Sequence, residues 1–299
     1  MPPPSSSTRT PERFAAFGLS DQELRALAER ALAEDVGSGD VTTRLTVPPD
    51  TMARGELIAK QELVVAGLPV AMEVFKVLDP LVEFESFVDE GALAHARTVL
   101  ARATGKAATL LAGERVALNF LQHLCGVATL TWHLKSKLAG LPTELLDTRK
   151  TTPGLRPLEK YAVRLGGGRN HRMRLDDGIL IKNNHLKLAG GIRAAVEKAR
   201  AERPAVAPAL PIEVEVRSIR EVDEAISSGA EALLLDNLTP AEVRECVARA
   251  AGRVRLEVSG SVNAENIRAY AETGVDCISV GALTHSAPAA DIHFLIEPV

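Results

Sequence analysis

The second half of the sequence alternates short apolar runs with amphipathic helical stretches, and this alternation constrains the fold more than any other feature. The apolar runs are residues 143–147, 178–181, 211–216, 231–235, 254–258 and 276–280. Such a rhythm predicts parallel βαβ units, in which a helix follows each strand. Six strands are fewer than a complete (β/α)8 barrel needs. We therefore expect an α/β fold with an open, incomplete barrel, and a doubly wound parallel sheet is the alternative.

The third apolar run, PIEVEV over residues 211–216, helps to choose between these folds. Its valines alternate with Glu213 and Glu215, so one face of the strand carries two carboxylates. In a sheet that helices cover on both faces, burying these charges is costly. In a barrel the same face points towards a solvated mouth, and the pattern therefore favours the barrel.

The first part of the sequence predicts a different domain with mixed α and β structure. Ser20 and Glu23 have the spacing of a capping box, and we expect the helix that they begin to end near Glu34. Further along we expect strands over 54–65, 82–88 and 97–103, a helix over 70–78, and two helices over 107–138 that break near Gly126. The resulting division is a flexible tail over 1–17, an N-terminal domain over 18–125 and a barrel domain over 126–299. A return of the C-terminal strand to the first domain stays open.

Charge and cysteine content exclude several classes of protein. The net charge of −4 gives no general reason to expect a nucleic-acid partner, and no apolar run approaches the roughly 18 residues of a membrane span. The three cysteines are too far apart for a metal knuckle and argue against a disulfide framework. We expect a cytoplasmic protein that binds neither nucleic acid nor membrane; Arg9 and Arg13 leave an organelle address as a weaker alternative.

The cationic charge is concentrated in one part of the chain. Between Arg149 and Arg193 there are eleven Lys or Arg residues and three acids, an excess of eight positive charges. In α/β barrels the chemistry sits where the strands end, and the predicted ends here carry cations, carboxylates or small residues. Arg and Lys suit carboxylates and phosphates, whereas Glu215 and Asp236 suit ribose hydroxyls or a hydrated Mg2+. The Gly and Ser segments suit a phosphate. We expect an anionic, phosphorylated substrate.

Residues 147–185, DTRKTTPGLRPLEKYAVRLGGGRNHRMRLDDGILIKNNH, resemble the quinolinate phosphoribosyltransferase family. Further segments that resemble it in the same order are EDVGSGDVTT (34–43), GERVALNFLQHLCGVAT (113–129), EVEV (213–216), LLLDN (233–237), LEVSGSV (256–262) and GVDCISVGALTHS (274–286). The resemblance implies an N-terminal α/β sandwich domain and an open α/β barrel of the type II phosphoribosyltransferase kind. It also implies a homodimer whose neighbouring N-terminal domain closes the active site, with higher assembly open.

The resemblance further implies an activity and its residues. Quinolinate and 5-phosphoribosyl 1-pyrophosphate give nicotinate mononucleotide, pyrophosphate and CO2 with Mg2+, in de novo NAD synthesis. Arg115 reaches quinolinate from the adjacent subunit, and the other quinolinate residues are Arg149, His171, Arg172 and Lys182, with Thr148 and Lys150 nearby. Glu215 and Asp236 face the ribose and its metal, and the 5′-phosphate lies on Ser259, Gly260, Ser261, Gly281 and Ala282. The catalytic residues are expected to be Lys150, Lys182, Glu215 and Asp236.

Some residues depart from the family pattern, and two other functions stay open. Ser261 and Arg174 stand where Gly is common, and Asn183 stands where Asp is usual. One alternative is a related phosphoribosyltransferase that uses nicotinate or another acceptor without decarboxylation; the number of cations favours the diacid. The other is a non-catalytic sensor of phosphate ligands, which would not need Glu215 and Asp236 beside the cations.

Overall fold

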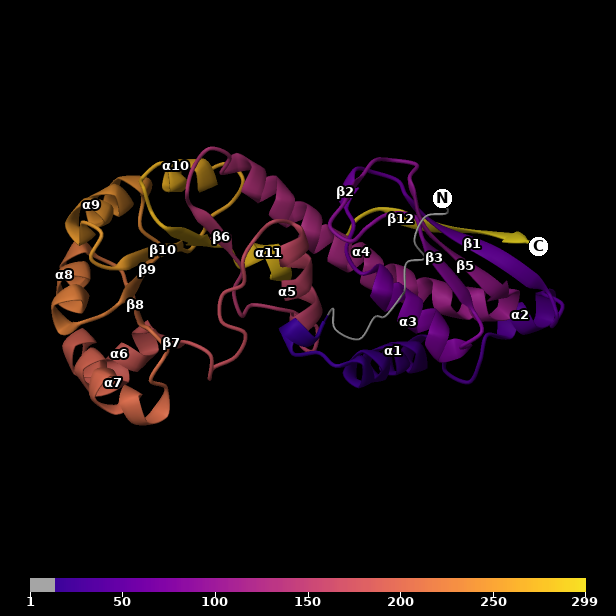
Figure 1. Cartoon of the computed structure of the whole chain (residues 1–299), viewed down its shortest axis with the longest axis horizontal. Coiled ribbons are helices and arrows are strands. Elements are labelled where there is room, and N and C mark those ends of the chain that lie inside the picture. The colour runs from indigo at the N-terminus through magenta and orange to yellow at the C-terminus, as the bar shows by residue number, and fades with distance from the viewer. Residues whose placement is uncertain (1–13) are drawn as a thin grey trace, which may run out of the picture. The chain divides into compact units, whose positions relative to one another are not determined.

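The computed structural model of the chain describes residues 14–299. They form two compact units, which Figure 1 colours along the chain. The first unit holds the described residues up to Leu130 together with Pro153–Gly166 and Ala287–Val299, and the second holds Thr131–Thr152 and Gly167–Ser286. Most of the tail expected over 1–17, with Arg9 and Arg13, lies outside the described residues. Phe14 is already packed, since its ring is buried and lies against the Tyr161 ring with centroids 4.8 Å apart.

The first unit is built on a four-stranded antiparallel sheet. Its strand order is β12 (Ile292–Pro298), β1 (Met52–Ala59), β5 (Val99–Lys106) and β3 (Glu83–Ser86), and a separate pair is formed by β2 (Leu63–Val64) and β4 (Leu93–Ala94). The C-terminal strand therefore returns to the N-terminal sheet. The helices of this unit are η1 (Ala15–Phe17), α1 (Asp21–Val36), α2 (Val41–Thr46), α3 (Leu68–Leu78), α5 (Arg156–Leu165) and most of α4. Phe75 of α3 stacks on Phe294 of β12, with centroids 5.8 Å apart, so α3 covers one face of the sheet.

Two helix ends test the sequence signals directly. The predicted capping box at Ser20 is present, with the Ser20 side chain accepting from the Glu23 N–H and the Glu23 side chain accepting from Ser20. The predicted break near Gly126 is wrong, because α4 (Ala107–Lys137) runs on without interruption. Gly126 instead permits a close approach: a Cβ atom there would lie 2.1 Å from the Pro288 carbonyl oxygen. The glycine is needed for packing, and the helix tolerates it.

The second unit contains a single parallel sheet of six strands. The strands are β6 (Glu144–Leu146), β7 (Ile179–Ile181), β8 (Ile212–Val216), β9 (Ala232–Asp236), β10 (Arg255–Ser259) and β11 (Cys277–Ser279), in the order β6-β11-β10-β9-β8-β7. They match the six runs predicted from the sequence. The two edge strands, β6 and β7, do not pair with each other; an isolated bridge joins Leu146 to Arg169 instead. The expected open α/β barrel is confirmed.

Helices cover the outer side of these strands (Figure 1). They are α6 (Asn183–Ala189), α7 (Ile192–Val206), α8 (Ile219–Ser228), α9 (Pro240–Ala250) and α10 (Ile267–Ala271), and the short α11 (Ala282–His285) follows β11. On β8 the side chains of Val214 and Val216 are fully buried, whereas Glu213 and Glu215 line cavities. The alternation of β8 therefore separates an apolar face, which packs, from a carboxylate face, which is available for chemistry.

Two further expectations concern the whole described chain. Within residues 14–299 no helix combines the length and the apolar character that crossing a membrane requires. All three cysteines are buried and carry free thiols. The structure therefore contains no disulfide among them, as their separation in the sequence predicts.

Candidate active site

A cavity of about 310 Å3 opens where the barrel strands end at their carboxyl sides. Its walls are Thr148, Arg149, Lys150, His171, Arg172, Leu180, Lys182, Glu215, Leu234, Asp236, Glu257, Ser259 and Ser279. All of these residues belong to the second unit. The end of the barrel that carries them is the end where chemistry is expected in this class of fold.

Nine of the predicted site residues line this cavity, and five do not. Arg115 belongs to the first unit, on α4, with a side chain that is 56% exposed and 4.0 Å from Glu114. Gly260, Ser261, Gly281 and Ala282 lie in the segments that follow β10 and β11, outside the lining. One of these segments still supports the cavity, since the Thr284 hydroxyl of α11 donates to the Lys150 carbonyl oxygen at 2.7 Å.

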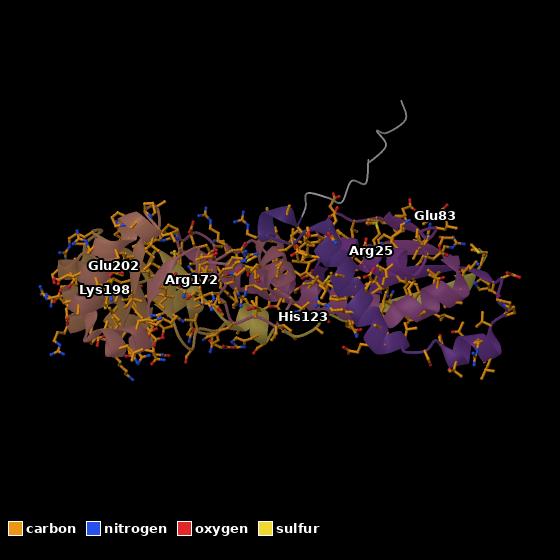
Figure 2. All side chains as sticks on the ribbon, turned by 90° about the horizontal axis from the view of Figure 1, so that it is seen from below. Arg25, Glu83, His123, Arg172, Lys198 and Glu202 are labelled. Atoms are coloured by element: carbon orange, nitrogen blue, oxygen red, sulfur yellow. The ribbon has the colours of Figure 1, made fainter. Side chains whose placement is uncertain are left out.

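The cationic side of the cavity contains Arg149, Lys150, Arg172 and Lys182. Burial lowers the pKa of Arg172, and the charge of Arg149 lowers it further. An Nη1 group of Arg172 donates to the Gly178 carbonyl oxygen at 2.7 Å, which fixes the guanidinium. Figure 2 labels Arg172 together with Lys198 and Glu202, two exposed residues of α7. Lys198 and Glu202 are surface charges, whereas the four cations line one cavity despite their mutual repulsion. Such a cluster provides a site for an anion with several charges.

Asp147 organises the loop that bears His171. Its carboxylate is fully buried and accepts the His171 backbone N–H at 2.8 Å and the Asn170 side-chain amide at 2.6 Å. The same loop pairs with β6, because the Arg169 N–H donates to the Leu145 carbonyl oxygen at 2.8 Å. A buried carboxylate with such partners is costly to remove. Asp147 therefore fixes His171 and its neighbour Arg172 at the edge of the cavity.

The His171 ring sits between two carboxylates in the barrel interior. Its Nε2 lies 3.4 Å from Glu213 and 3.4 Å from Glu257, and its Nδ1 accepts the Arg172 N–H at 2.7 Å. Burial by itself lowers the pKa of His171, but the two carboxylates outweigh it and raise this pKa to about 10. The carboxylates favour the imidazolium and the amide at Nδ1 favours the neutral ring, and in both forms Nε2 keeps its proton.

His171 and the two carboxylates have the composition of a metal site, but the ring nitrogen that faces the carboxylates carries a proton. Potential ligand atoms of His171, Glu213 and Glu257 lie within 4.8 Å of one another. A ring nitrogen must give up its proton to bind a metal. Because Nδ1 accepts a hydrogen bond, the proton stays on Nε2. The ring therefore acts as a donor to the two acids. It also separates the site from a second cavity of about 330 Å3, which His171 and Glu257 line as well.

The acidic side of the cavity is formed by Glu215 and Asp236, and one cation joins them. Arg217 Nη2 lies 2.9 Å from Glu215 and 3.0 Å from Asp236, and Arg217 Nε lies 3.1 Å from Asp236. Two carboxylates thus converge on a single positive group. Carboxylate oxygens are preferred ligands of Mg2+. The arrangement fits a divalent cation. Arg217 is not among the site residues predicted from the sequence.

The segment after β10 is shaped by its contact with the segment after β9. The Asn237 N–H donates to the Ser259 carbonyl oxygen at 2.9 Å. Gly260 has φ of +93°, and a Cβ atom at this position would lie 2.3 Å from Asn237 Oδ1. Ser261 also has a positive φ, of +51°. The turn therefore needs a glycine at 260, and it presents backbone groups next to the cavity residue Ser259.

Comparison with known proteins gives a consistent result over nearly the whole chain. Residues 40–125 match the family model "Quinolinate phosphoribosyl transferase, N-terminal domain", and residues 127–295 match the corresponding C-terminal domain. A probable nicotinate-nucleotide pyrophosphorylase (carboxylating) of Synechocystis is 44% identical, covering 89% of this chain and 90% of the relative; one of Bacillus subtilis is 41% identical, covering 92% and 93%. The solved nicotinate-nucleotide pyrophosphorylase of Francisella tularensis superposes with a TM-score of 0.88 at 38% identity, covering 93% of this chain and 98% of that one.

Proposed function

The chain belongs to the quinolinate phosphoribosyltransferase family, and we propose that it transfers the phosphoribosyl group of 5-phosphoribosyl 1-pyrophosphate to quinolinate. The products are nicotinate mononucleotide, pyrophosphate and CO2. This is the decarboxylating pentosyl transfer of de novo NAD synthesis. The observation that carries the proposal is a single cavity that brings four cations, Arg149, Lys150, Arg172 and Lys182, together with the carboxylates of Glu215 and Asp236.

We assign the cations to the two anionic substrates. Arg149, His171, Arg172 and Lys182 bind the two carboxylates of quinolinate, because guanidinium groups pair with carboxylates through two parallel hydrogen bonds. Thr148 and Lys150 lie beside them at the end of β6, where the Lys150 N–H donates to the Thr148 hydroxyl at 3.0 Å. The 5′-phosphate is proposed to lie on the segments Ser259–Ser261 and Gly281–Ala282. Quinolinate is thus placed at the cationic wall of the cavity, which Arg149, Lys150, Arg172 and Lys182 form. The ribose is placed at the side of Glu215 and Asp236.

The transfer step needs no covalent intermediate with the protein. The quinolinate nitrogen forms a bond to C1 of the ribose while the bond from C1 to pyrophosphate breaks, and positive charge develops on the sugar ring. Glu215 and Asp236 are placed to stabilise that charge. Because their side chains are only 9% and 15% exposed, little solvent screens their charges. Holding the two substrates in line is the main contribution of the cationic wall.

Loss of CO2 follows on the same ring. Once the ring nitrogen has four bonds, the bond from C2 to its carboxylate breaks, the electron pair stays on C2 and CO2 leaves. The adjacent positive nitrogen stabilises that pair, and C2 then takes a proton. Lys150 and Lys182 are the proposed assisting groups. The protein mainly has to keep the 2-carboxylate in position until it leaves.

The acidic side of the cavity fits the proposed Mg2+. The fit rests on the convergence of two carboxylates on one cationic nitrogen, at 2.9 Å and 3.0 Å. Glu215 and Asp236 would hold the ion together with phosphate oxygens of the substrate. When bound, the ion supplies positive charge to the departing pyrophosphate.

We also propose a homodimer in which Arg115 of one subunit completes the site of the other. The exposed position of Arg115, which makes it available to a second chain, supports this.

The proposed domain boundary at 125/126 is supported by the ends of the two family matches, although the compact units part at Leu130. We propose a cytoplasmic location, with no nucleic-acid or membrane partner.

Labelled quinolinate tests the proposed reaction. Purified protein is incubated with phosphoribosyl pyrophosphate, Mg2+ and quinolinate that carries 14C in its 2-carboxylate. We expect the label to appear in CO2 alone. Unlabelled pyrophosphate and unlabelled nicotinate mononucleotide should form in amounts equal to that CO2. Retention of the label in the nucleotide product would refute the decarboxylation.

A further inference from the structure

Arg217 occupies a place that the proposed reaction does not explain. It follows directly after β8, and its guanidinium contacts the two carboxylates that face the ribose. A cation in this place neutralises part of the charge that we assign to transition-state stabilisation. The residue therefore needs a role of its own.

The pairing of two strands places Arg217 there. Strands β8 and β9 are parallel, with Glu215 opposite Leu234 and Val216 opposite Leu235. The next step along both strands brings Arg217 level with Asp236. Because side chains alternate along a strand, Arg217 and Glu215 lie on the same side. One guanidinium is thus close to an acid on its own strand and to an acid on the neighbouring strand.

The three side chains differ in how firmly they are held. Glu215 is 9% exposed and Asp236 is 15% exposed, whereas the Arg217 side chain is 51% exposed. Ion pairs of a solvent-exposed side chain contribute little to stability, because water readily replaces the partner. The acids therefore form a fixed pair, and the arginine is the member that can leave.

The guanidinium and a divalent cation would compete for the same oxygen atoms. Arg217 Nη2 lies 2.9 Å from Oε1 of Glu215 and 3.0 Å from Oδ2 of Asp236, so it takes up the point on which the two acids converge. Two cations at such a short distance from each other repel strongly. Binding of a metal ion at this point therefore requires Arg217 to move away.

We propose that Arg217 is an exchangeable counter-cation, which keeps free divalent ions off Glu215 and Asp236 until the diphosphate substrate brings the ion in. The diphosphate adds oxygen ligands for the ion and offers the released guanidinium an anionic partner. The identity of that substrate rests on the function proposed above. The exclusion of the free ion is a property of the chain alone and is measured without any substrate.

Binding of Mn2+ to the substrate-free protein tests the proposal. Mn2+ prefers the same oxygen ligands as Mg2+, and the unbound ion is counted by its electron paramagnetic resonance signal. We expect Arg217→Ala to bind Mn2+ about tenfold more tightly than the wild type, equal to about 1.4 kcal/mol. Arg220→Ala is the matched control, because it removes the same charge from an exposed position three residues further on. Arg220→Ala should leave the affinity unchanged.

Two additional variants locate the effect and guard against misfolding. Adding Glu215→Gln to Arg217→Ala should remove the gained affinity, which places the ion at this pair of acids. If Arg217→Ala unfolds, as thermal unfolding would reveal, Arg217→Gln carries the same expectation with a side chain of similar shape. Equal Mn2+ affinity in the wild type and the folded Arg217 variant would overturn the proposal. So would an equal gain in Arg220→Ala. A failure of the quinolinate reaction would leave this titration unaffected.

Discussion

The Nε2 atom of His171 lies 3.4 Å from the carboxylate of Glu257, so the imidazole and this acid form a close pair at the edge of the cavity. With Glu213, this contact raises the pKa of His171 from 6.5 to about 10. A group with a raised folded-state pKa stabilises the fold fully below pH 6.5, and this contribution disappears as the pH rises through about 10.

We therefore expect the wild type to lose more free energy of unfolding than His171→Gln between pH 6.5 and pH 10. The expected difference is on the order of a few kcal/mol. Denaturant unfolding at a series of pH values measures it. Parallel curves for the two proteins would contradict the raised pKa and would indicate a neutral ring in the native state.

Replacing an arginine of the cationic wall should affect the two substrates unequally. Arg149→Ala and Arg172→Ala should each weaken quinolinate binding by roughly 2 to 5 kcal/mol, if truncation leaves a desolvated carboxylate without its partner. The effect on phosphoribosyl pyrophosphate should be smaller. Calorimetric titration with each substrate separates the two. Arg174→Ala, in an exposed part of the same loop, is the control and should change neither. Equal losses for both substrates would refute the assignment.

The turn after β10 offers a pair of glycine substitutions with opposite surroundings. Gly260 and Gly252 both have positive φ, of +93° and +72°, but an added Cβ meets Asn237 at Gly260 and open space at Gly252. Gly260→Ala should therefore distort the turn and weaken phosphoribosyl pyrophosphate binding about tenfold, a cost of ~1.4 kcal/mol.

Gly252→Ala should lower the free energy of unfolding by about 1 kcal/mol, because alanine is strained at positive φ, and should leave substrate binding unchanged. Binding isotherms and denaturation curves for both variants check this. Similar binding losses in the two variants would show that backbone strain, and not the contact with Asn237, is responsible.

Sharing of the site between subunits predicts complementation. Chains with Arg115→Ala and chains with Glu215→Ala should each be nearly inactive, since one lacks a quinolinate contact and the other a group that stabilises the transition state. In a mixed dimer, one of the two sites receives both native residues. Activity should reappear on mixing under conditions that exchange subunits. Purified heterodimers that stay inactive would argue against a shared site.

The sequence predicts the fold well where local patterns suffice. All six barrel strands follow from apolar runs, and the open barrel follows from their number and from the carboxylates on 211–216. Polar residues at the ends of these strands, such as Arg149 and Asp236, line the cavity because parallel strands end at one edge. Ser20 begins the first helix because a capping box is a local interaction.

Contacts between distant segments are harder to predict. Gly126 suggests a break in a helix, but Pro288, far away in the sequence, explains why glycine is needed there. Arg217 resembles an ordinary surface charge until the pairing of β8 with β9 brings it to Asp236. Glu257 and Ser279 also line the cavity. They lie within strands that are otherwise largely apolar, so the sequence does not mark them as site residues. The alternation along 211–216 gave a signal for Glu213, and its contact with His171 depends on the folded barrel.

The choice of acceptor tests the proposed reaction most directly. Purified protein is incubated with phosphoribosyl pyrophosphate and Mg2+, and with either quinolinate or nicotinate, while mononucleotide and CO2 are measured. We predict nicotinate mononucleotide and CO2 from quinolinate and no comparable product from nicotinate. Mononucleotide from nicotinate but not from quinolinate would contradict the proposal that quinolinate is the acceptor.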